Sequence, residues 1–466
     1  MRQPPVSQER VIKLSQALEK GQRRRPVPVA VRLVLGLVII ISLGTLMLLL
    51  PGMTTRPITV MDAWFTATSA STITGLTVLT TSKDFTLLGQ IVLLCLIQLG
   101  GVGYMVLIAL ALQLLGRRVS LLDRLAVSTS LGLDKPAAIL RLLRQVVAGI
   151  FIIEGVGAML LYLHWRFSGI VAPEKAAFYA IFHAISAFCN AGFDLFAGLP
   201  EYPRGIPGDN ITLLIMGWLI VLGGLGIPVF VDFSQFRRRR RLTSHTQLTL
   251  IVVVFLTLLG WLGLYLSETK AGGILEMASL SERLVHTWFQ SVSARTAGFP
   301  GLRDFSQLLP ESRLLLMMLM FFVCAPASLG GGITTGTFGV LGLVFWNSVH
   351  GRSTVRFRKR SVSNETIRRA AAVLSISLIL VFVATWLILF THDLAFSDAL
   401  FEVVSALATC GLSLGVTGEL NSFGRVVIIL MMFWGRLGAL TIAVALLQTR
   451  PEKQLVQYPE ATLLIG

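Results

Sequence analysis

The sequence carries little charge for its length. Asp, Glu, Lys and Arg make up 14% of the 466 residues, whereas soluble globular proteins carry about 25%. Cysteine is scarce as well. The four cysteines lie far apart in apolar segments, so no pair has metal-ligand spacing and no disulfide framework is indicated; they are Cys95, Cys189, Cys324 and Cys410. With hydrophobic residues at 54%, the composition excludes an ordinary soluble domain and indicates a polytopic membrane protein.

Apolar stretches recur along the whole chain. A helix needs about 20 such residues to cross about 30 Å of hydrocarbon, and eight stretches approach or exceed that length. They lie near 31–50, 85–115, 144–165, 210–232, 246–266, 312–346, 369–391 and 422–447. The first is too long for the apolar core of a signal peptide, so we expect it to stay as an anchor. Eight crossings place both termini on the same side of the membrane.

Acidic residues are fewer than basic ones, 24 against 40, and the basic excess is confined to certain segments. These are the segments that would share one side of the membrane, namely 1–32, 116–144, 233–245, 347–369 and 448–466. The positive-inside rule makes that side cytoplasmic and the protein a multi-pass protein of the cell membrane. The five arginines of Arg237–Arg241 are expected to anchor the topology at the lipid headgroups rather than to bind nucleic acid. A regulatory protein docking on this basic face is the alternative.

One pattern of residues occurs four times. It consists of Phe, then Ser-Ala four residues later, then Gly nine or ten residues after the Phe, and the copies span 65–75, 182–192, 289–298 and 401–411. A glycine-containing run follows each copy, at 96–103, 219–226, 328–332 and 434–438. Such periodicity indicates a repeat architecture. We predict a basic tail (1–30), four repeats (31–115, 116–236, 237–346 and 347–447) and a second tail (448–466).

The segment from Phe to Gly is apolar but too short to cross a membrane, which predicts a re-entrant half-helix. The irregular backbone at its end is tolerated at membrane depth only where protein buries it or where it lines a watery cavity. Four such ends predict one shared cavity. The fold class is therefore an all-α membrane protein with eight transmembrane helices, in four helix–re-entrant pore loop–helix repeats around a pseudo-fourfold central pore.

The tips of the four half-helices are suited to a monovalent cation. A half-helix that enters from outside directs its negative carbonyl end to the membrane centre, and glycine lets successive carbonyls turn inward as a ring. Ca²⁺ and Mg²⁺ prefer carboxylates, and none recurs at the tips, so we expect potassium, ahead of sodium, bound by backbone carbonyls. The alternative is that the glycines only relieve helix packing. The expected ligands are Ile73, Thr74, Gly75, Asn190, Ala191, Gly192, Thr296, Ala297, Gly298, Thr409, Cys410 and Gly411.

The sequence resembles the Trk/Ktr/HKT superfamily of potassium transporters, most closely the KtrB-type membrane subunit. The resemblance runs through all four repeats to the tail, and its most specific motifs are Thr74-Gly75-Leu76, Asn190-Ala191-Gly192-Phe193, Arg295-Thr296-Ala297-Gly298-Phe299 and Gly435-Arg436-Leu437-Gly438. It implies potassium uptake, channel-like or by symport, by a homodimer with a cytoplasmic nucleotide-binding ring of the KtrA type. Sodium is a candidate activator, and no organic cofactor is expected. In the family, glycine at the position of Gly75 accompanies potassium selectivity and serine accompanies sodium transport.

The resemblance also implies a gate in the third repeat. Three adjacent glycines and several hydroxyls interrupt the stretch 312–346, and each glycine costs a helix about 0.8–1.0 kcal/mol relative to alanine. A static packing kink is the alternative. The expected gate residues are Ser328, Leu329, Gly330, Gly331, Gly332, Thr334, Thr335 and Arg436. Thr334 and Ala327 stand where the family commonly has lysine and glycine, and Pro300 is unusual, which leaves the gating stimulus open.

Arg436 replaces a glycine of the repeat deep in the last stretch, where a charge costs about 2.5–3.5 kcal/mol. We expect it to form an electrostatic barrier below the tips, or else to tie helices together. Glu154 is an acid within the third stretch whose partner the sequence does not identify.

Competing functions are a sodium or non-selective cation transporter and, from another class, a membrane-embedded enzyme or a scaffold. No catalytic constellation accompanies the repeat, so we do not expect an enzyme.

Overall fold

The computed structural model describes residues 29–102, 139–202, 205–302, 305–322, 325, 328, 330–352, 354–358 and 360–438. Residues 1–28 of the first predicted tail, the whole second tail, the connection 103–138 and the predicted gate residue Leu329 lie outside these residues. The regular elements of the described residues are helices, apart from one antiparallel hairpin of β1 (Arg356–Phe357) and β2 (Arg360–Ser361). Short connections are formed by α4 (Thr81–Asp84), η2 (Phe305–Gln307) and η3 (Val416–Glu419).

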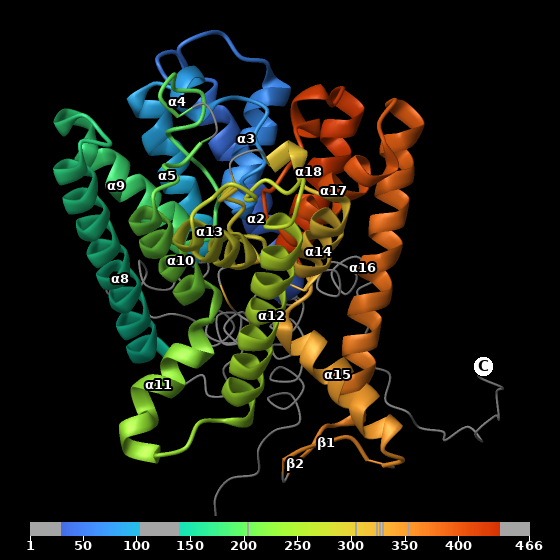
Figure 1. The fold of residues 1–466 in the computed structure, drawn as a ribbon. Helices are drawn as coiled ribbons and strands as arrows, with labels where there is room; N and C mark the ends of the chain where they lie inside the picture. The colour runs from blue at the N-terminus through green and yellow to red at the C-terminus, as the bar shows by residue number, and fades with distance from the viewer. Residues whose placement is uncertain are drawn as a thin grey trace, which may run out of the picture.

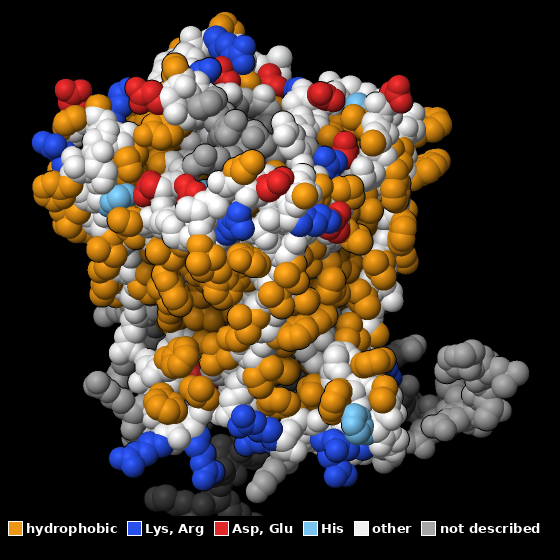
Figure 2. Space-filling model, viewed as in Figure 1, with side chains coloured by type: hydrophobic (Ala, Val, Ile, Leu, Met, Phe, Trp, Pro, Cys, Tyr) orange, Lys and Arg blue, Asp and Glu red, His pale blue; other side chains and the backbone are white. Residues whose placement is uncertain are grey.

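Four long helices form the frame. They are α2 (Val29–Leu48), α8 (Ile139–Ser168), α12 (Ser244–Glu268) and α16 (Asn364–Thr391). Among the described residues, these four helices are long and apolar enough to cross a membrane unaided, and they coincide with four of the predicted apolar stretches. Figure 2 shows hydrophobic side chains covering the middle of the molecule as a broad belt, with Lys and Arg side chains along its lower edge. Side chains exposed in such a belt face lipid rather than water.

Four short helices lie between the long ones, in the upper half of Figure 1. They are α3 (Val60–Thr72), α9 (Pro173–Phe188), α13 (Leu280–Ser293) and α17 (Phe396–Ala408). Their 13 to 16 residues span about 20–24 Å at 1.5 Å per residue, which is less than the hydrocarbon thickness. Thr59 and Ser279 start α3 and α13 with capping boxes, and Pro173 starts α9, where a missing N–H costs nothing.

The second helix of each unit is shorter or broken. These helices are α5 (Leu87–Val102), α10 (Asn210–Gly224) with α11 (Ile227–Arg239), α14 (Pro310–Phe321) with α15 (Thr335–Val349), and α18 (Ser422–Leu437). The sequence predicts one span over 210–232, but α10 and α11 meet at 90°. The physical reason is Gly226, whose φ of +82° leaves the helical region, followed by Pro228, which has no N–H for the previous turn. The number of eight spans stays a prediction, because parts of the second and eighth stretches lie outside the described residues.

The units pack in a closed cycle. In the first, second and fourth units the short helix packs against both the long helix and the second helix of its own unit, as α3 packs against α2 and α5, whereas α13 packs against α12 and α10. The second helix also packs against the short helix of the next unit: α5 against α9, α10 against α13, α14 against α17, and α18 against α3. The last of these contacts joins the fourth unit back to the first. The cycle thus places the four short helices around a common centre.

Candidate functional site

Three of the four short helices end in the same way. The residue after α3, Ile73, is left-handed with φ 53°, as are Asn190 after the last turn of α9 and Thr409 after α17, at 57° and 49°. The N–H of Thr74 donates to Ser69 O at 2.8 Å and that of Ile73 donates to Ala70 O at 3.2 Å. This is a Schellman motif, which satisfies helix-end carbonyls and turns the chain. A β-branched residue in this conformation is strained, and such strain concentrates at functional sites.

The third unit differs because it is one residue shorter between Phe and Gly. Thr296 stands two residues before Gly298, as Ile73 stands before Gly75, but its φ is not positive. The N–H groups of Thr296, Ala297 and Gly298 all donate to the carbonyl of Ser293, at 3.2, 2.9 and 3.2 Å. The deleted residue is thus the one that would take the left-handed conformation. All four units still reach the glycine with a positive φ, between 69° and 95°.

The glycines of the four tips meet one another in a ring. We name residues 73–75, 190–192, 296–298 and 409–411 the four glycine segments. A Cβ on Gly75 would lie 2.6 Å from the carbonyl oxygen of Ala191, the residue before the next glycine. The same relation holds from Gly192 to Ala297 O (2.5 Å), from Gly298 to Cys410 O (2.1 Å) and from Gly411 back to Thr74 O (2.2 Å). Only glycine permits so close an approach, so the ring requires glycine in each unit.

One cavity of about 400 Å³ opens onto this ring. Gly75, Gly192, Gly298 and Gly411 all line it, together with Thr77, Thr80, Thr81, Asp194, Ser413 and further residues of the outer loops. The structure thus brings the four predicted tips to a single polar cavity. Uncharged backbone carbonyls around a cavity suit a weakly hydrated monovalent cation. Among the described residues, no group of three or more His, Cys, Asp or Glu could hold a metal ion.

The serine of the repeated pattern braces the glycine segment in every unit. In the first and fourth units the serine hydroxyl accepts a hydrogen bond from the glycine N–H, at 3.1 Å for Ser69 with Gly75 and 3.1 Å for Ser405 with Gly411. In the other two units the serine hydroxyl donates to the carbonyl that follows the glycine. Those distances are 2.8 Å from Ser186 to Phe193 O and 2.7 Å from Ser293 to Phe299 O. The sequence showed the serine but not this role.

The second glycine signature has a packing role that sequence reasoning missed. A Cβ on Gly100 would lie 2.2 Å from Ser71 O, one on Gly223 would lie 1.8 Å from Phe188 O, and one on Gly435 would lie 2.0 Å from Leu407 O. The three carbonyls belong to equivalent positions, four residues before the glycine of the tip. These glycines therefore let the second helix of the unit touch the last turn of the short helix. The recurrence itself was the available signal.

The predicted gate lies between α14 and α15, and its described residues, 322, 325, 328 and 330–334, are not helical. We name residues 322–334 the glycine-rich loop. The N–H of Gly331 donates to Thr409 Oγ1 at 2.9 Å, and that of Gly332 donates to Gly435 O at 3.0 Å. The loop thus touches the fourth glycine segment and α18 behind it. Thr334 caps α15, which begins at Thr335, whereas Ser328 and Gly330 lie earlier in the loop.

Three charged side chains lie close to the tips. The guanidinium of Arg436 donates to the carbonyl oxygen of Gly100, at the end of α5 in the first unit. Arg295, 6% exposed, donates to Val253 O of α12 at 3.3 Å. Glu154 on α8 accepts two hydrogen bonds from the amide of Gln98, at 3.0 and 3.1 Å. Gln98 is therefore the partner of Glu154 that the sequence did not identify.

Comparison with known proteins gives consistent matches. A family model described as TrkH, cation transport protein, matches residues 33–458. Ktr system potassium uptake protein B of Vibrio alginolyticus is 34% identical over 425 residues, which cover 91% of this chain and 92% of that protein. The protein of the same name from Bacillus subtilis is 33% identical over 434 residues, covering 93% of this chain and 96% of that protein.

Two further matches bear on ion choice and on the fold. Potassium/sodium uptake protein NtpJ of Enterococcus hirae is 31% identical over 464 residues, covering 96% of this chain and 99% of that protein. The crystal structure of the potassium transporter TrkH from Vibrio parahaemolyticus has a TM-score of 0.68 and covers 90% of this chain and 84% of that chain. At 19% sequence identity, that likeness concerns the fold alone.

Proposed function

Because this chain belongs to the TrkH family of cation transport proteins, we propose that it carries potassium into the cell through the ring of the four glycine segments. The family and these relatives are ion transporters and not enzymes. Two relatives that match over nearly their whole length are described as potassium uptake proteins. The single observation that carries the proposal is the ring itself: four glycines, each against the carbonyl of the next unit, line one cavity.

The proposed ion ligands are the carbonyl oxygens of the four glycine segments. The N–H groups of Thr74, Ala191, Ala297 and Cys410 donate back to the serine carbonyls of their own short helices, at 2.8 to 2.9 Å. The carbonyl of each of these residues lies against the glycine of a neighbouring unit in the ring. The short helices add their negative ends, and the described ring contains no carboxylate. This combination supports a monovalent cation stripped of water rather than a divalent one.

The glycine-rich loop is the proposed gate. Its contacts with Thr409 and Gly435 support a position beside the fourth glycine segment, where displacement of the loop would open a path. Arg436 adds positive charge at this level of the molecule. We further propose that the protein works as a homodimer under a nucleotide-binding cytoplasmic ring of the KtrA type, with sodium as activator and both termini cytoplasmic. The basic lower edge in Figure 2 supports that orientation.

The test is rubidium uptake in cells that lack their own potassium uptake systems. The wild-type chain should restore uptake, and Gly75→Ser should lower the preference for potassium over sodium by roughly tenfold, about 1.4 kcal/mol, since its Cβ would strike Ala191 O. Gly52→Ser is the matched control, because Gly52 has φ 88°, close to the 87° of Gly75, with nothing within 4 Å of its Cβ. Equal preference in Gly75→Ser and wild type, at equal abundance, contradicts the ring as the selective element.

A second function, combined potassium and sodium uptake, is favoured by the match to NtpJ. The two functions differ in one measurement. If sodium competes with rubidium for uptake by the wild-type protein at comparable concentrations, the pathway carries both ions. If sodium at low concentration instead accelerates rubidium uptake, it acts as an activator of potassium transport.

A further inference from the structure

The residue after the repeated Phe is polar and buried in all four units, although it lies on an apolar short helix. These residues are Thr66, His183, Gln290 and Glu402, each 1% exposed or less. A buried polar group is costly unless it is hydrogen-bonded. The partners of these side chains therefore indicate what the position does.

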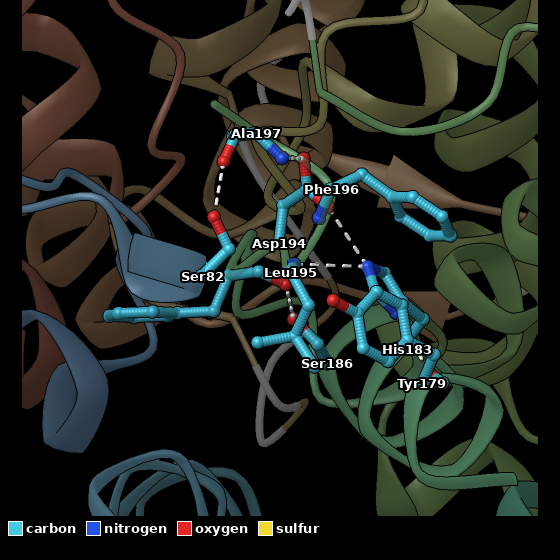
Figure 3. A network of polar contacts seen from close by, with 9 residues as sticks. Ser82, Tyr179, His183, Ser186, Asp194, Leu195, Phe196 and Ala197 are labelled. Carbon is cyan, nitrogen blue, oxygen red and sulfur yellow. Dashed lines mark hydrogen bonds and ion pairs between the residues drawn. The ribbon is translucent and has the colours of Figure 1, made fainter. Parts of the chain in front are cut away.

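In the second unit the partner is the chain that leaves the glycine segment. Figure 3 shows His183 directed at the loop of Asp194 to Ala197. His183 Nε2 lies 2.9 Å from Asp194 Oδ1, and its other ring nitrogen, Nδ1, lies 2.8 Å from Tyr179 O of its own helix. Both oxygens of Asp194 also accept backbone N–H groups of the loop, at 2.7 and 3.1 Å. Asp194 lines the cavity, yet its carboxylate is engaged in holding the loop rather than left free at the mouth.

The fourth unit repeats this arrangement with different chemistry. Glu402 accepts a hydrogen bond from Ser413 Oγ at 2.7 Å and another from Thr417 Oγ1. Ser413 stands two residues after Gly411, as Asp194 stands two after Gly192. The two partners are separated by 11 residues in both units.

The third unit places an amide at this position. Gln290 Oε1 accepts the N–H of Gly301 at 2.7 Å, again across 11 residues. His286, one turn earlier on α13, holds the carbonyl of the same Gly301 through Nδ1 at 2.5 Å. The first unit is the exception: Thr66 Oγ1 donates to Asp62 O of its own helix at 2.8 Å.

We propose that His183, Gln290 and Glu402 are positioning residues that fix the carbonyl ring and thereby its preference for potassium over sodium. The proposal rests on the proposed function of the ring. Each of the three side chains ties a short helix to the chain that follows the glycine, so the second, third and fourth glycine segments are fixed at both ends. A ring held in this way resists contracting onto the smaller sodium ion, whereas a ring released at one end adapts to it.

The experiment compares two substitutions at Glu402. We call the hydrogen bonds of His183, Gln290 and Glu402 to the chain after the glycine the clamps. Glu402→Ala removes the clamp of the fourth unit, and the preference for potassium over sodium, measured as competition with rubidium uptake, should fall by about tenfold. Glu402→Gln introduces the residue that the third unit carries at this position, and should restore most of the preference. Thr66→Val is the matched control, because the hydroxyl of Thr66 donates its hydrogen bond to Asp62 O of the same helix. This variant should leave the preference unchanged.

Ion preference can also be measured without transport. The measurement compares the potassium concentration and the sodium concentration that are needed to protect the purified protein from heat unfolding. Glu402→Ala should need similar concentrations of the two ions. If that variant does not fold, His183→Ala and Ser413→Ala remove contacts of the same kind and should shift the ratio in the same direction. The proposal is wrong if folded Glu402→Ala keeps the wild-type ratio of sodium to potassium concentrations. It is also wrong if Thr66→Val shifts that ratio as much as Glu402→Ala does. Wild-type protein that takes up no rubidium yet is protected selectively by potassium overturns the proposed function and leaves the clamp measurement intact.

Discussion

At the scale of single residues, the glycines fall into classes that follow from where a methyl group would go. Gly75, Gly192, Gly298 and Gly411 face the carbonyl of a neighbouring unit, whereas Gly100, Gly223 and Gly435 face the carbonyl of their own short helix. Others, such as Gly155 on α8, have nothing within 4 Å of an added Cβ. The recurrence of glycine was visible in the sequence. The separation of the glycines into these classes was not, because it depends on which carbonyl lies beside each glycine in the fold.

Gly223→Ala should destabilise the protein severely, because the new Cβ would lie 1.8 Å from Phe188 O and backbone cannot yield as a flexible side chain does. Overpacking of this kind costs typically 1–3 kcal/mol or more. Gly155→Ala should instead be neutral or gain about 0.5–1 kcal/mol, because alanine loses less entropy in a helix. The midpoints of heat unfolding in detergent measure both. Equal midpoints for the two variants would contradict the close contact of α10 with α9.

The left-handed residues show where residue-level prediction stops. Propensity does not place β-branched Ile73 or Thr409 at positive φ, so the Schellman ends of α3 and α17 were not foreseen. The one-residue deletion in the third unit was visible, but its consequence was not. The missing residue is the left-handed one, and only the three longer copies, seen folded, reveal that.

At the scale of elements, the apolar stretches predicted the long helices well and the second helices less well. Continuous apolar runs of this length have one stable form in lipid, so α2, α8, α12 and α16 could be read from the sequence. The interruption of the stretch 312–346 was also predicted, from its three glycines. The bend between α10 and α11 was not predicted, because the run 219–226, which ends at Gly226, was interpreted as part of one continuous span.

Gly331→Ala tests whether the glycine-rich loop is a gate. Its Cβ would lie 2.6 Å from Thr409 Oγ1 and 2.8 Å from Gly435 O, so the loop should be displaced from the fourth glycine segment. Displacement of a gate raises rubidium flux per molecule, by several-fold if the loop is closed most of the time. Gly342→Ala on α15, with nothing within 4 Å, is the control. Flux that is unchanged or lower in folded Gly331→Ala argues for a static kink instead.

At the scale of the whole molecule, two ion pairs join successive units at equivalent positions. Arg425 on α18 contacts Asp62 in the first turn of α3 at 2.6 Å, and Arg313 on α14 contacts Asp398 in the first turn of α17 at 3.3 Å. Each Asp stands three residues before the repeated Phe. Sequence reasoning could not pair Arg425 with Asp62, because 363 residues separate them and only the closed cycle of units brings them together.

The pair of Arg425 and Asp62 should therefore couple the fourth unit to the first. In a double-mutant cycle of Arg425→Gln and Asp62→Asn, we expect a coupling energy of about 0.5–1 kcal/mol, because the side chains are only 21% and 15% exposed and exposed pairs are worth less. The control cycle is Lys270 with Glu311, a pair within the third unit whose side chains are 53% and 47% exposed. Its coupling should be near zero and should vanish in high salt. Unfolding midpoints of the purified variants give both coupling energies. If the coupling of Arg425 with Asp62 is no larger than that of Lys270 with Glu311, packing alone closes the ring.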